Sequence, residues 1–242
     1  MRWLCTVCAR GGSKGVPDKN TRPLCGRPLI AWTILQATAS GLFERIVVSS
    51  DSPAILDAGL KAGADAAIER PAELATDLAA KVPAIRHAVI AAEQLHGGPY
   101  DFVVDLDATA PLRLPQDITG AARLIETSGA TNVITATSAR HSPYFNLVER
   151  GADGTVRLSK PTDQRIVRRQ DVLPCFDMNA SIYVWQRNTF VADPRIFYPD
   201  TALYEMPAER GHDIDSELDF HIVEFLFERL RIADHLVARQ GA

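Results

Sequence analysis

The chain has 242 residues, of which 46% are hydrophobic, and its formal net charge is -4. This length and composition fit one α/β domain, or one domain with an insertion. The charge balance gives no global basic field for nucleic acid, and no apolar run approaches the roughly 18–20 residues that span a bilayer. The first residues show no secretory leader, so we expect a cytoplasmic protein with neither a membrane nor a nucleic-acid partner.

Strands and helices alternate along the first part of the chain. The apolar run 3–8 predicts a buried strand, and residues 28–41 predict a helix with Pro28 in its first turn. The same reasoning predicts the strands 45–49, 66–68, 102–106 and 132–136 and the helices 53–62, 81–95 and 116–127. This alternation is typical of an α/β, Rossmann-like fold, in which helices cover both faces of a mostly parallel sheet.

The pattern changes between residues 140 and 180. Turn signals and a polar loop replace the alternation, and short β-like pieces lie at 145–149 and 181–185. We interpret 140–180 as a small β-rich arm inserted into a single domain of residues 1–242, and we expect the arm to be an oligomer contact. The chain then returns through an extended piece at 202–206 and a helix over 216–231.

A glycine-rich loop follows the first strand. Residues 9–20 contain three glycines, a serine at Ser13, and the basic side chains of Arg10, Lys14 and Lys19. Glycine lets backbone N–H groups come close to an anion, and successive N–H groups form a concave anion site. The loop is neither a Walker A motif nor a dinucleotide-binding G-x-G-x-x-G motif. It therefore predicts a polyphosphate site of another kind, at the carboxyl end of a parallel sheet.

Two other polar segments also follow predicted strands, at 49–52 and 107–113. Because the carboxyl ends of parallel strands meet at one edge, we expect both segments to border the same crevice as the loop. Asp107 is placed at the crevice edge and Asp105 within its strand. Asp51 precedes a predicted helix, and we interpret it as a helix cap.

Asp213 and Asp215 lie two residues apart before the last predicted helix. In extended backbone this spacing projects both carboxylates to one side. Mg²⁺ commonly takes one or two carboxylates together with phosphate oxygens, so the pair is a candidate metal site. Capping of the helix by Asp215 or Ser216 is the alternative, and the spacing alone leaves both interpretations open.

Cys5 and Cys8 have the C-x-x-C spacing of redox and metal sites. Residues three apart on a strand point to opposite faces, so the pair meets only if the chain bends at Cys8. We expect buried, reduced thiols.

Several motifs together resemble the CMP-sialic acid synthetases, which are cytidylyltransferases that activate nine-carbon acidic sugars. They lie at 9–20, 48–51, 70–77, 109–113, 179–183 and 213–219. Within this family the chain is most similar to the CMP-legionaminic acid synthetases, through residues 4–15, 105–113, 143–147 and 177–183. The resemblance implies a nucleotidyltransferase-type fold and a homodimer in which the 140–180 arm reaches the partner's site.

The resemblance also implies a reaction and a set of site residues. The reaction transfers CMP from CTP to the anomeric hydroxyl of a nine-carbon α-keto acid sugar, most closely a legionaminic acid derivative, and releases pyrophosphate. The implied catalytic residues are Arg10, Lys19 and Asp215. The implied nucleotide contacts are Arg10, Gly11, Ser13, Lys14, Lys19, Asn20, Arg70 and Ala79. The implied sugar contacts are Asp107, Tyr144, Phe145, Arg169, Gln170 and Asp177, and Mg²⁺, or Mn²⁺ in its place, is expected on Asp213 and Asp215.

Two alternatives stay open. The same chemistry could act on N-acetylneuraminic, pseudaminic or 3-deoxy-octulosonic acid. A non-catalytic regulatory protein that binds a nucleotide would share the glycine-rich loop, but it would not need the two carboxylates at Asp213 and Asp215.

Overall fold

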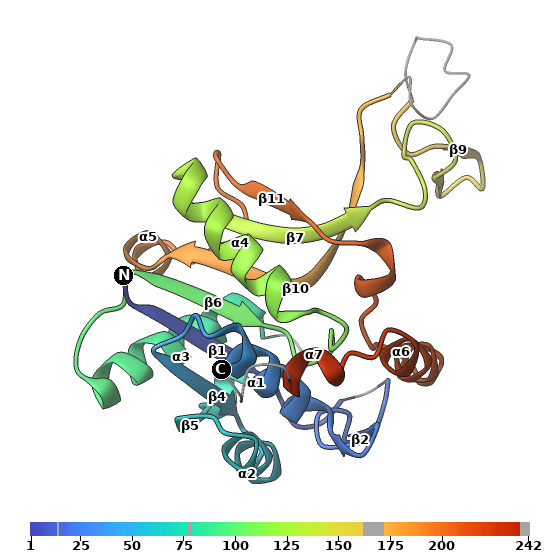
Figure 1. Cartoon of the computed structure of the whole chain (residues 1–242). Helices are drawn as coiled ribbons and strands as arrows, with labels where there is room; N and C mark the ends of the chain where they lie inside the picture. Colours follow the sequence, from blue (N-terminus) through green and yellow to red (C-terminus); the bar gives the residue numbers. More distant parts are fainter. Residues whose placement is uncertain (14, 77–78, 162–171, 238–242) are drawn as a thin grey trace.

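The computed structural model describes residues 1–13, 15–76, 79–161 and 172–237. Within these residues, seven strands form one sheet in the order β11-β7-β10-β6-β1-β4-β5 (Figure 1). They are β1 (Trp3–Cys8), β4 (Arg45–Ser50), β5 (Ala66–Glu69), β6 (Phe102–Leu106), β7 (Asn132–Ser138), β10 (Phe176–Gln186) and β11 (Ala202–Glu205). Strand β10 runs antiparallel to β6 and β7, and the other pairs are parallel. The predicted mostly parallel sheet is confirmed.

Helices cover both faces of the sheet, as predicted. One face packs against α1 (Leu29–Ser40), α2 (Pro53–Lys61) and α4 (Pro115–Ser128), and the other against α3 (Lys81–His96) and α5 (Arg187–Ala192). The side chains of β1 alternate between the two cores, with Cys5 in the first and Leu4 in the second. A strand that is buried on both faces has a continuous apolar sequence, as residues 3–8 do.

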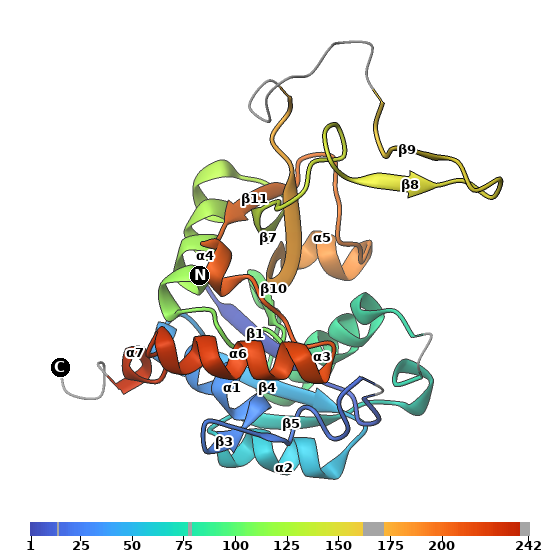
Figure 2. The ribbon, with the colours of Figure 1, turned by 90° about the vertical axis from the view of Figure 1, so that its right-hand side faces the viewer.

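A third apolar cluster lies beneath the glycine-rich loop. It joins Val16 of the loop to Leu112, Ile214 and α6 (Glu217–Arg229), with a contribution from α7 (Asp234–Val237). Helix α6 lies alongside α1, where the Trp32 and Phe227 ring centroids are 4.6 Å apart (Figure 2). The cluster also holds the short hairpin of β2 (Pro23–Leu24) and β3 (Arg27–Pro28). The loop and the acidic segment near residue 214 therefore pack on the same apolar cluster.

The region predicted as an inserted arm differs in detail from the prediction. Residues 181–185 belong to β10, which is a strand of the main sheet and not a piece of the arm. The strand expected at 145–149 begins later, as β8 (Val148–Arg150). Residues 143–146 form a turn instead, in which the Ser142 carbonyl accepts the N–H groups of residues 145–147. Strand β8 pairs with β9 (Val156–Leu158) in a hairpin that projects from the body of the molecule (Figure 2).

The four cysteines are free thiols. Cys5 is fully buried in β1, and Cys8 ends the same strand. Burial, with the nearby charge of Asp105, raises the pKa of both thiols. The predicted burial is confirmed for Cys5, whereas Cys8 is only half-buried.

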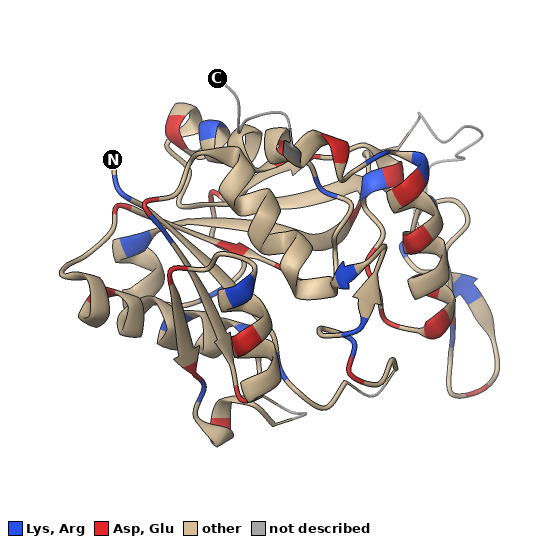
Figure 3. Ribbon diagram, turned by 60° about the horizontal axis from the view of Figure 1, so that its bottom comes forward, with Lys and Arg blue, Asp and Glu red and all other residues tan. Residues whose placement is uncertain are grey.

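Acidic and basic residues are interspersed along the ribbon (Figure 3). The described residues contain no helix that combines the length and the hydropathy needed to cross a membrane.

Candidate functional site

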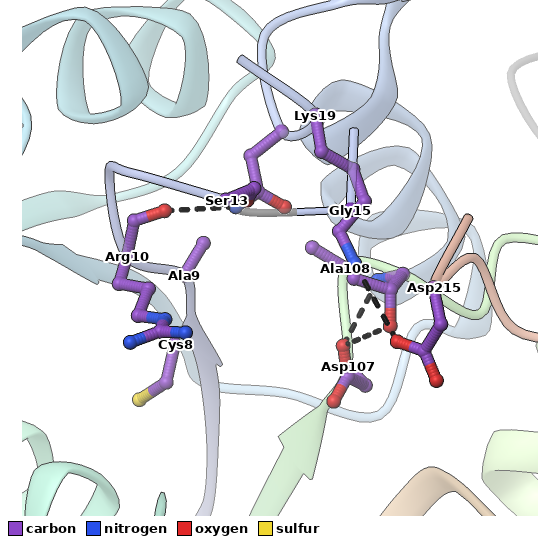
Figure 4. A pocket seen from close by; sticks show the side chains of 11 residues that line it. Cys8, Ala9, Arg10, Ser13, Gly15, Lys19, Asp107, Ala108 and Asp215 are labelled. Atoms are coloured by element: carbon purple, nitrogen blue, oxygen red, sulfur yellow. Dashed lines mark hydrogen bonds and ion pairs between the residues drawn. The ribbon is translucent and has the colours of Figure 1, made fainter. Parts of the chain in front are cut away.

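The glycine-rich loop forms a wall of a pocket at the carboxyl ends of β1 and β6. The pocket measures about 260 Å³ and is lined by Cys8, Ala9, Arg10, Ser13, Gly15, Lys19, Asn20, Asp107, Ala108, Thr109 and Asp215. Figure 4 shows Arg10 and Cys8 on one side, with Asp107 and Asp215 opposite them. The predicted convergence of the loop with the segment after β6 is thus observed.

The loop keeps its curvature through glycine and through one buried side chain. Gly12 has a φ of 61°, which is in the left-handed region where glycine is favoured. The Asn20 amide donates a hydrogen bond to the Arg10 carbonyl oxygen at 3.0 Å, and Asn20 is 5% exposed. The two ends of the loop are therefore held together across its opening.

The loop touches the acidic segment from the far end of the chain. A Cβ atom at Gly15 would lie 1.9 Å from the Asp215 carbonyl oxygen, so only glycine fits there. Ile214 is fully buried, its N–H donates to the Thr109 carbonyl at 2.9 Å, and its carbonyl accepts from the Lys19 ammonium. The Lys19 ammonium also lies 3.8 Å from an Asp215 carboxylate oxygen. With Ile214 as a buried anchor, Asp213 and Asp215 flank it on the solvent side.

Neither carboxylate of the pair is used as a helix cap. The N-cap of α6 is Ser216, which forms a capping box with Asp219. Burial, and then the charge of Asp215, raise the pKa of Asp213, and Asp107 contributes to the same effect. The described residues hold no group of three or more metal-ligating side chains. A cation here would therefore need ligands beyond the protein, as Mg²⁺ does when it binds phosphate oxygens.

A second pocket of about 260 Å³ adjoins the first through Cys8, Arg10 and Asp107. Arg70 and Ala79, both expected to contact a nucleotide, lie on its wall. Arg70 is 8% exposed, and its guanidinium donates to the Ser49 carbonyl at 3.0 Å. The Arg70 Nε is buried and has no hydrogen-bond partner among the described residues.

Arg10 is shared by these two pockets and by a smaller one beside the loop. Its guanidinium donates to the Thr76 carbonyl at 3.2 Å. Because Arg10 borders all three spaces, a ligand that extends from the second pocket into the loop passes its side chain.

The prediction that Asp51 caps the next helix is wrong. The N-cap of α2 is Ser52, and no side-chain capping bond is made there. Instead, Asp51 Oδ1 accepts the Gly11 N–H at 2.9 Å. Strands β1 and β4 are adjacent and parallel, so Asp51 leaves the sheet beside the loop. The Gly11 N–H, expected to face a nucleotide, is therefore bonded within the chain.

A cluster of charged side chains beside the pockets was not predicted from the sequence. It consists of Lys81, Asp105 and Arg113 around Asp107. The Lys81 ammonium lies 2.9 Å from an Asp105 oxygen and 2.7 Å from an Asp107 oxygen. Arg113 is fully buried and donates to the Asp107 carbonyl oxygen, and burial lowers its pKa to about 10. Asp105 lies inside its strand, as predicted, but its carboxylate belongs to this charged cluster.

The residues expected on the sugar side are not gathered in one place. Asp107 lines both larger pockets. Tyr144 and Phe145 lie in the turn before β8, where the Lys160 ammonium is 5.6 Å from the centre of the Tyr144 ring. Asp177 lies on β10 and accepts the Arg140 N–H at 3.1 Å. The lining of the three pockets includes none of Tyr144, Phe145 and Asp177. Lys14, Arg169 and Gln170 fall outside the described residues.

Comparison with known proteins identifies relatives along nearly the whole chain. A family model described as "Cytidylyltransferase" matches residues 4–230. Post-translational flagellin modification protein B of Campylobacter coli is 45% identical over 225 residues, which are 93% of this chain and 94% of that protein. The CMP-N,N'-diacetyllegionaminic acid synthase of Campylobacter jejuni is 44% identical over 223 residues, which are 92% of this chain and 94% of that protein.

The fold also matches a solved structure. The structure of CMP:2-keto-3-deoxy-manno-octonic acid synthetase complexed with CTP aligns with a TM-score of 0.69 at 15% identity. The alignment covers 95% of this chain and all of the other.

Proposed function

The chain belongs to the cytidylyltransferase family, and from this premise we propose that it transfers CMP from CTP to the anomeric hydroxyl of a nine-carbon α-keto acid sugar. The observation that supports the proposal most is the meeting of the loop 9–20 with Asp215, two residues after Asp213, at the carboxyl ends of β1 and β6. A basic, glycine-rich wall facing two carboxylates suits a nucleoside triphosphate bound with a divalent cation.

In the proposed mechanism the chain positions two substrates and offsets negative charge. Arg10, Ser13 and Lys19 bind the triphosphate, and Lys14 is assigned to the same group by its place in the loop. The sugar hydroxyl attacks the α-phosphorus in line, and pyrophosphate leaves. Arg10 stabilises the charge that develops on pyrophosphate, and most of the rate enhancement of such transfers comes from positioning and charge stabilisation.

Asp213 and Asp215 suit a divalent cation by the chemistry of their donor set. Both are carboxylates that no helix cap uses, and burial together with the charge of Asp215 raises the pKa of Asp213. When bound, Mg²⁺ or Mn²⁺ neutralises phosphate charge. Asp213 and Asp215 would hold it, and Lys19 fixes the backbone between them through the Ile214 carbonyl.

The second pocket is assigned to the cytosine base. The guanidinium of Arg70 supplies hydrogen-bond donors, and Ala79 lies on the same wall. With the base there and the triphosphate on the loop, Arg10 would contact both parts of CTP, because it lines both pockets.

The acceptor is assigned as a legionaminic acid derivative, a proposal supported by the 44% identity to an enzyme of that name. The test measures pyrophosphate release with CTP and four acceptors: N,N'-diacetyllegionaminic, N-acetylneuraminic, pseudaminic and 3-deoxy-octulosonic acids. We expect the highest kcat/KM with the first, by about tenfold or more, because a site built to pair polar substituents discriminates strongly against acceptors that lack them. UTP and ATP in place of CTP serve as the nucleotide controls.

Two results would contradict this assignment in different ways. A higher kcat/KM with another acceptor would move the proposal to that sugar and leave the nucleotide chemistry in place. CTP binding without turnover on any acceptor would favour the non-catalytic alternative.

We also propose that the chain forms a homodimer through the 140–180 arm. Large apolar side chains are exposed along this arm and at the start of β10, namely Phe145, Leu147, Val148, Val156, Leu173, Phe176 and Met178. Exposed apolar patches of this kind mark interaction surfaces. Tyr144 and Asp177 do not line the pockets of their own chain. In a dimer in which the arm reaches the partner's site, both residues could contact the sugar bound there.

Val148 and Val156 test this proposal, because both are exposed and lie on the two strands of the projecting hairpin. We expect light scattering to give twice the chain mass of 26.5 kDa for the wild type and a single chain mass for the variant Val148→Asp with Val156→Asp. Leu60→Asp, at an exposed apolar position of α2, is the control and stays dimeric. A single chain mass for the wild type would contradict the proposal.

A further inference from the structure

Lys81 occupies a position where a lysine is unfavourable. It is the first residue of α3, which begins after Ala80. The N-terminal end of a helix carries a partial positive charge that disfavours a cation. A residue that breaks a local rule in this way, on the wall of the second pocket, points to a role in the site.

The contacts of Lys81 explain how the cation is tolerated. Its ammonium bridges Asp105, which is fully buried, and Asp107, which borders both larger pockets. The ammonium also lies 5.2 Å from the centre of the Tyr183 ring. Thr6 donates its hydroxyl to Asp105 at 2.8 Å, so the inner carboxylate is fixed as well. One lysine thus pairs with two carboxylates, of which Asp105 is buried and Asp107 is partly exposed to the pockets.

Asp107 is fully fixed by this arrangement. One carboxylate oxygen accepts from Lys81, and the other accepts from the Thr109 N–H and hydroxyl, each at 2.9 Å. Burial opposes ionisation of Asp107, but Lys81 and Thr109 outweigh it and hold the pKa of Asp107 well below its usual range. A carboxylate in this state accepts hydrogen bonds and is a poor base, so it can orient a hydroxyl or amide N–H without removing its proton.

The position of Asp107 determines what it can meet. The inference rests on the proposed function, in which the base fills the second pocket and the triphosphate lies on the loop. The α-phosphorus then lies where the two pockets join, and Asp107 is on the wall there. A fixed negative charge repels phosphate oxygens but attracts a hydrogen-bond donor, and the incoming sugar supplies hydroxyl and amide donors at this place.

We propose that Lys81 is a positioning residue, which holds Asp107 as a preset hydrogen-bond acceptor for the acceptor sugar. In this role Lys81 contributes to sugar affinity and orientation, although its ammonium binds carboxylates of the chain and not the substrate.

The test removes the cation without leaving an unpaired buried charge. Lys81→Met alone would leave Asp105 buried and uncompensated, so it is made together with Asp105→Asn, and the double variant is compared with Asp105→Asn. Methionine keeps the length of the side chain on the pocket wall. Lys61→Met is the matched control, because Lys61 also pairs with a carboxylate at 2.7 Å, on the exposed face of α2.

We expect the double variant to raise KM for N,N'-diacetyllegionaminic acid at least tenfold over Asp105→Asn. KM for CTP, and Kd for CTP measured by calorimetry, change less than threefold. Lys81→Arg in the same background keeps a cation beside Asp107 and recovers at least threefold of the loss. Asp107→Asn replaces an acceptor oxygen by an N–H donor and leaves Lys81 paired with Asp105. It should give the same split between the two substrates.

Two outcomes would overturn the inference. An unchanged KM for the sugar in both the double variant and Asp107→Asn would show that Asp107 does not meet the acceptor. An equal rise in KM for CTP would place Asp107 on the nucleotide. Failure of the proposed function is distinct, because the wild type and Lys61→Met would then release no pyrophosphate with any acceptor, and the inference would fall with its premise.

Discussion

Arg10→Ala is expected to fold like the wild type and to release pyrophosphate from CTP at least about 10³-fold more slowly. Loss of one preorganised donor to a developing oxyanion typically costs 10²–10³-fold, and a charged arginine on a phosphoryl group costs more. Arg10 borders all three pockets at the loop, so its guanidinium faces both parts of the proposed nucleotide. The measurement is pyrophosphate release under saturating CTP and sugar, with thermal unfolding as the check on the fold.

Arg10→Lys separates charge from geometry. Lysine keeps the positive charge but lacks the planar fork that pairs two oxygens at once, so we expect a rate between those of the wild type and Arg10→Ala. Arg123→Ala, at an exposed position of α4, is the control and keeps full activity. A rate for Arg10→Ala within tenfold of the wild type would contradict the assignment of the loop to the triphosphate.

Asp213→Asn with Asp215→Asn is expected to remove activity and divalent-cation binding together. Loss of the charge that a metal ion supplies costs several kcal/mol, so we expect at least about a hundredfold fall in kcat. Titration of Mn²⁺ in the presence of CTP measures cation binding directly, and Asp57→Asn on α2 is the control. Full activity of the double variant, or of the wild type in excess EDTA, would contradict the metal assignment.

The stability of Asp213→Asn provides an independent check. Burial and the charge of Asp215 raise the pKa of Asp213 from 3.8, so the folded chain holds this proton more tightly than the unfolded chain. The free energy of unfolding of the wild type therefore falls as pH rises from 3.8 towards the raised pKa of Asp213. At neutral pH the ionised Asp213 destabilises the fold. In EDTA, the free energy of unfolding of Asp213→Asn relative to the wild type should increase over that pH range. A decrease would contradict the crowding of carboxylates at this site.

The sheet was predictable where the sequence of a strand or helix is locally distinctive. Strand β1 and the helices after it have continuous apolar runs or clear end signals, and their predicted bounds differ from the observed ones by a few residues. Strand β10 was only partly predicted because a bulge interrupts it. The register with β7 shifts between Met178 and Tyr183, where Ala180 has a φ of 52°, so the alternation is lost in its first half. Pairing in the middle of a sheet is also a long-range property that local pattern does not contain.

The site was predictable where composition alone marks it. The loop and the pair Asp213 and Asp215 have unusual local chemistry, and the family assignment made from them is confirmed. Asp51 and Lys81 have no such mark, because their roles come from partners on other elements. Asp51 meets Gly11 only because β1 and β4 pair, and Lys81 meets Asp107 only because α3 begins beside the end of β6.

The contact between Gly15 and Asp215 has a consequence for folding. All strands of the main sheet end by Glu205, but the first pocket needs Asp215, and residue 15 leaves the ribosome long before residue 215. Contacts between residues so distant in sequence form late and slowly. Nucleotide affinity should therefore develop last, after the sheet is complete. In refolding from urea, recovery of CTP binding should lag behind recovery of far-ultraviolet circular dichroism.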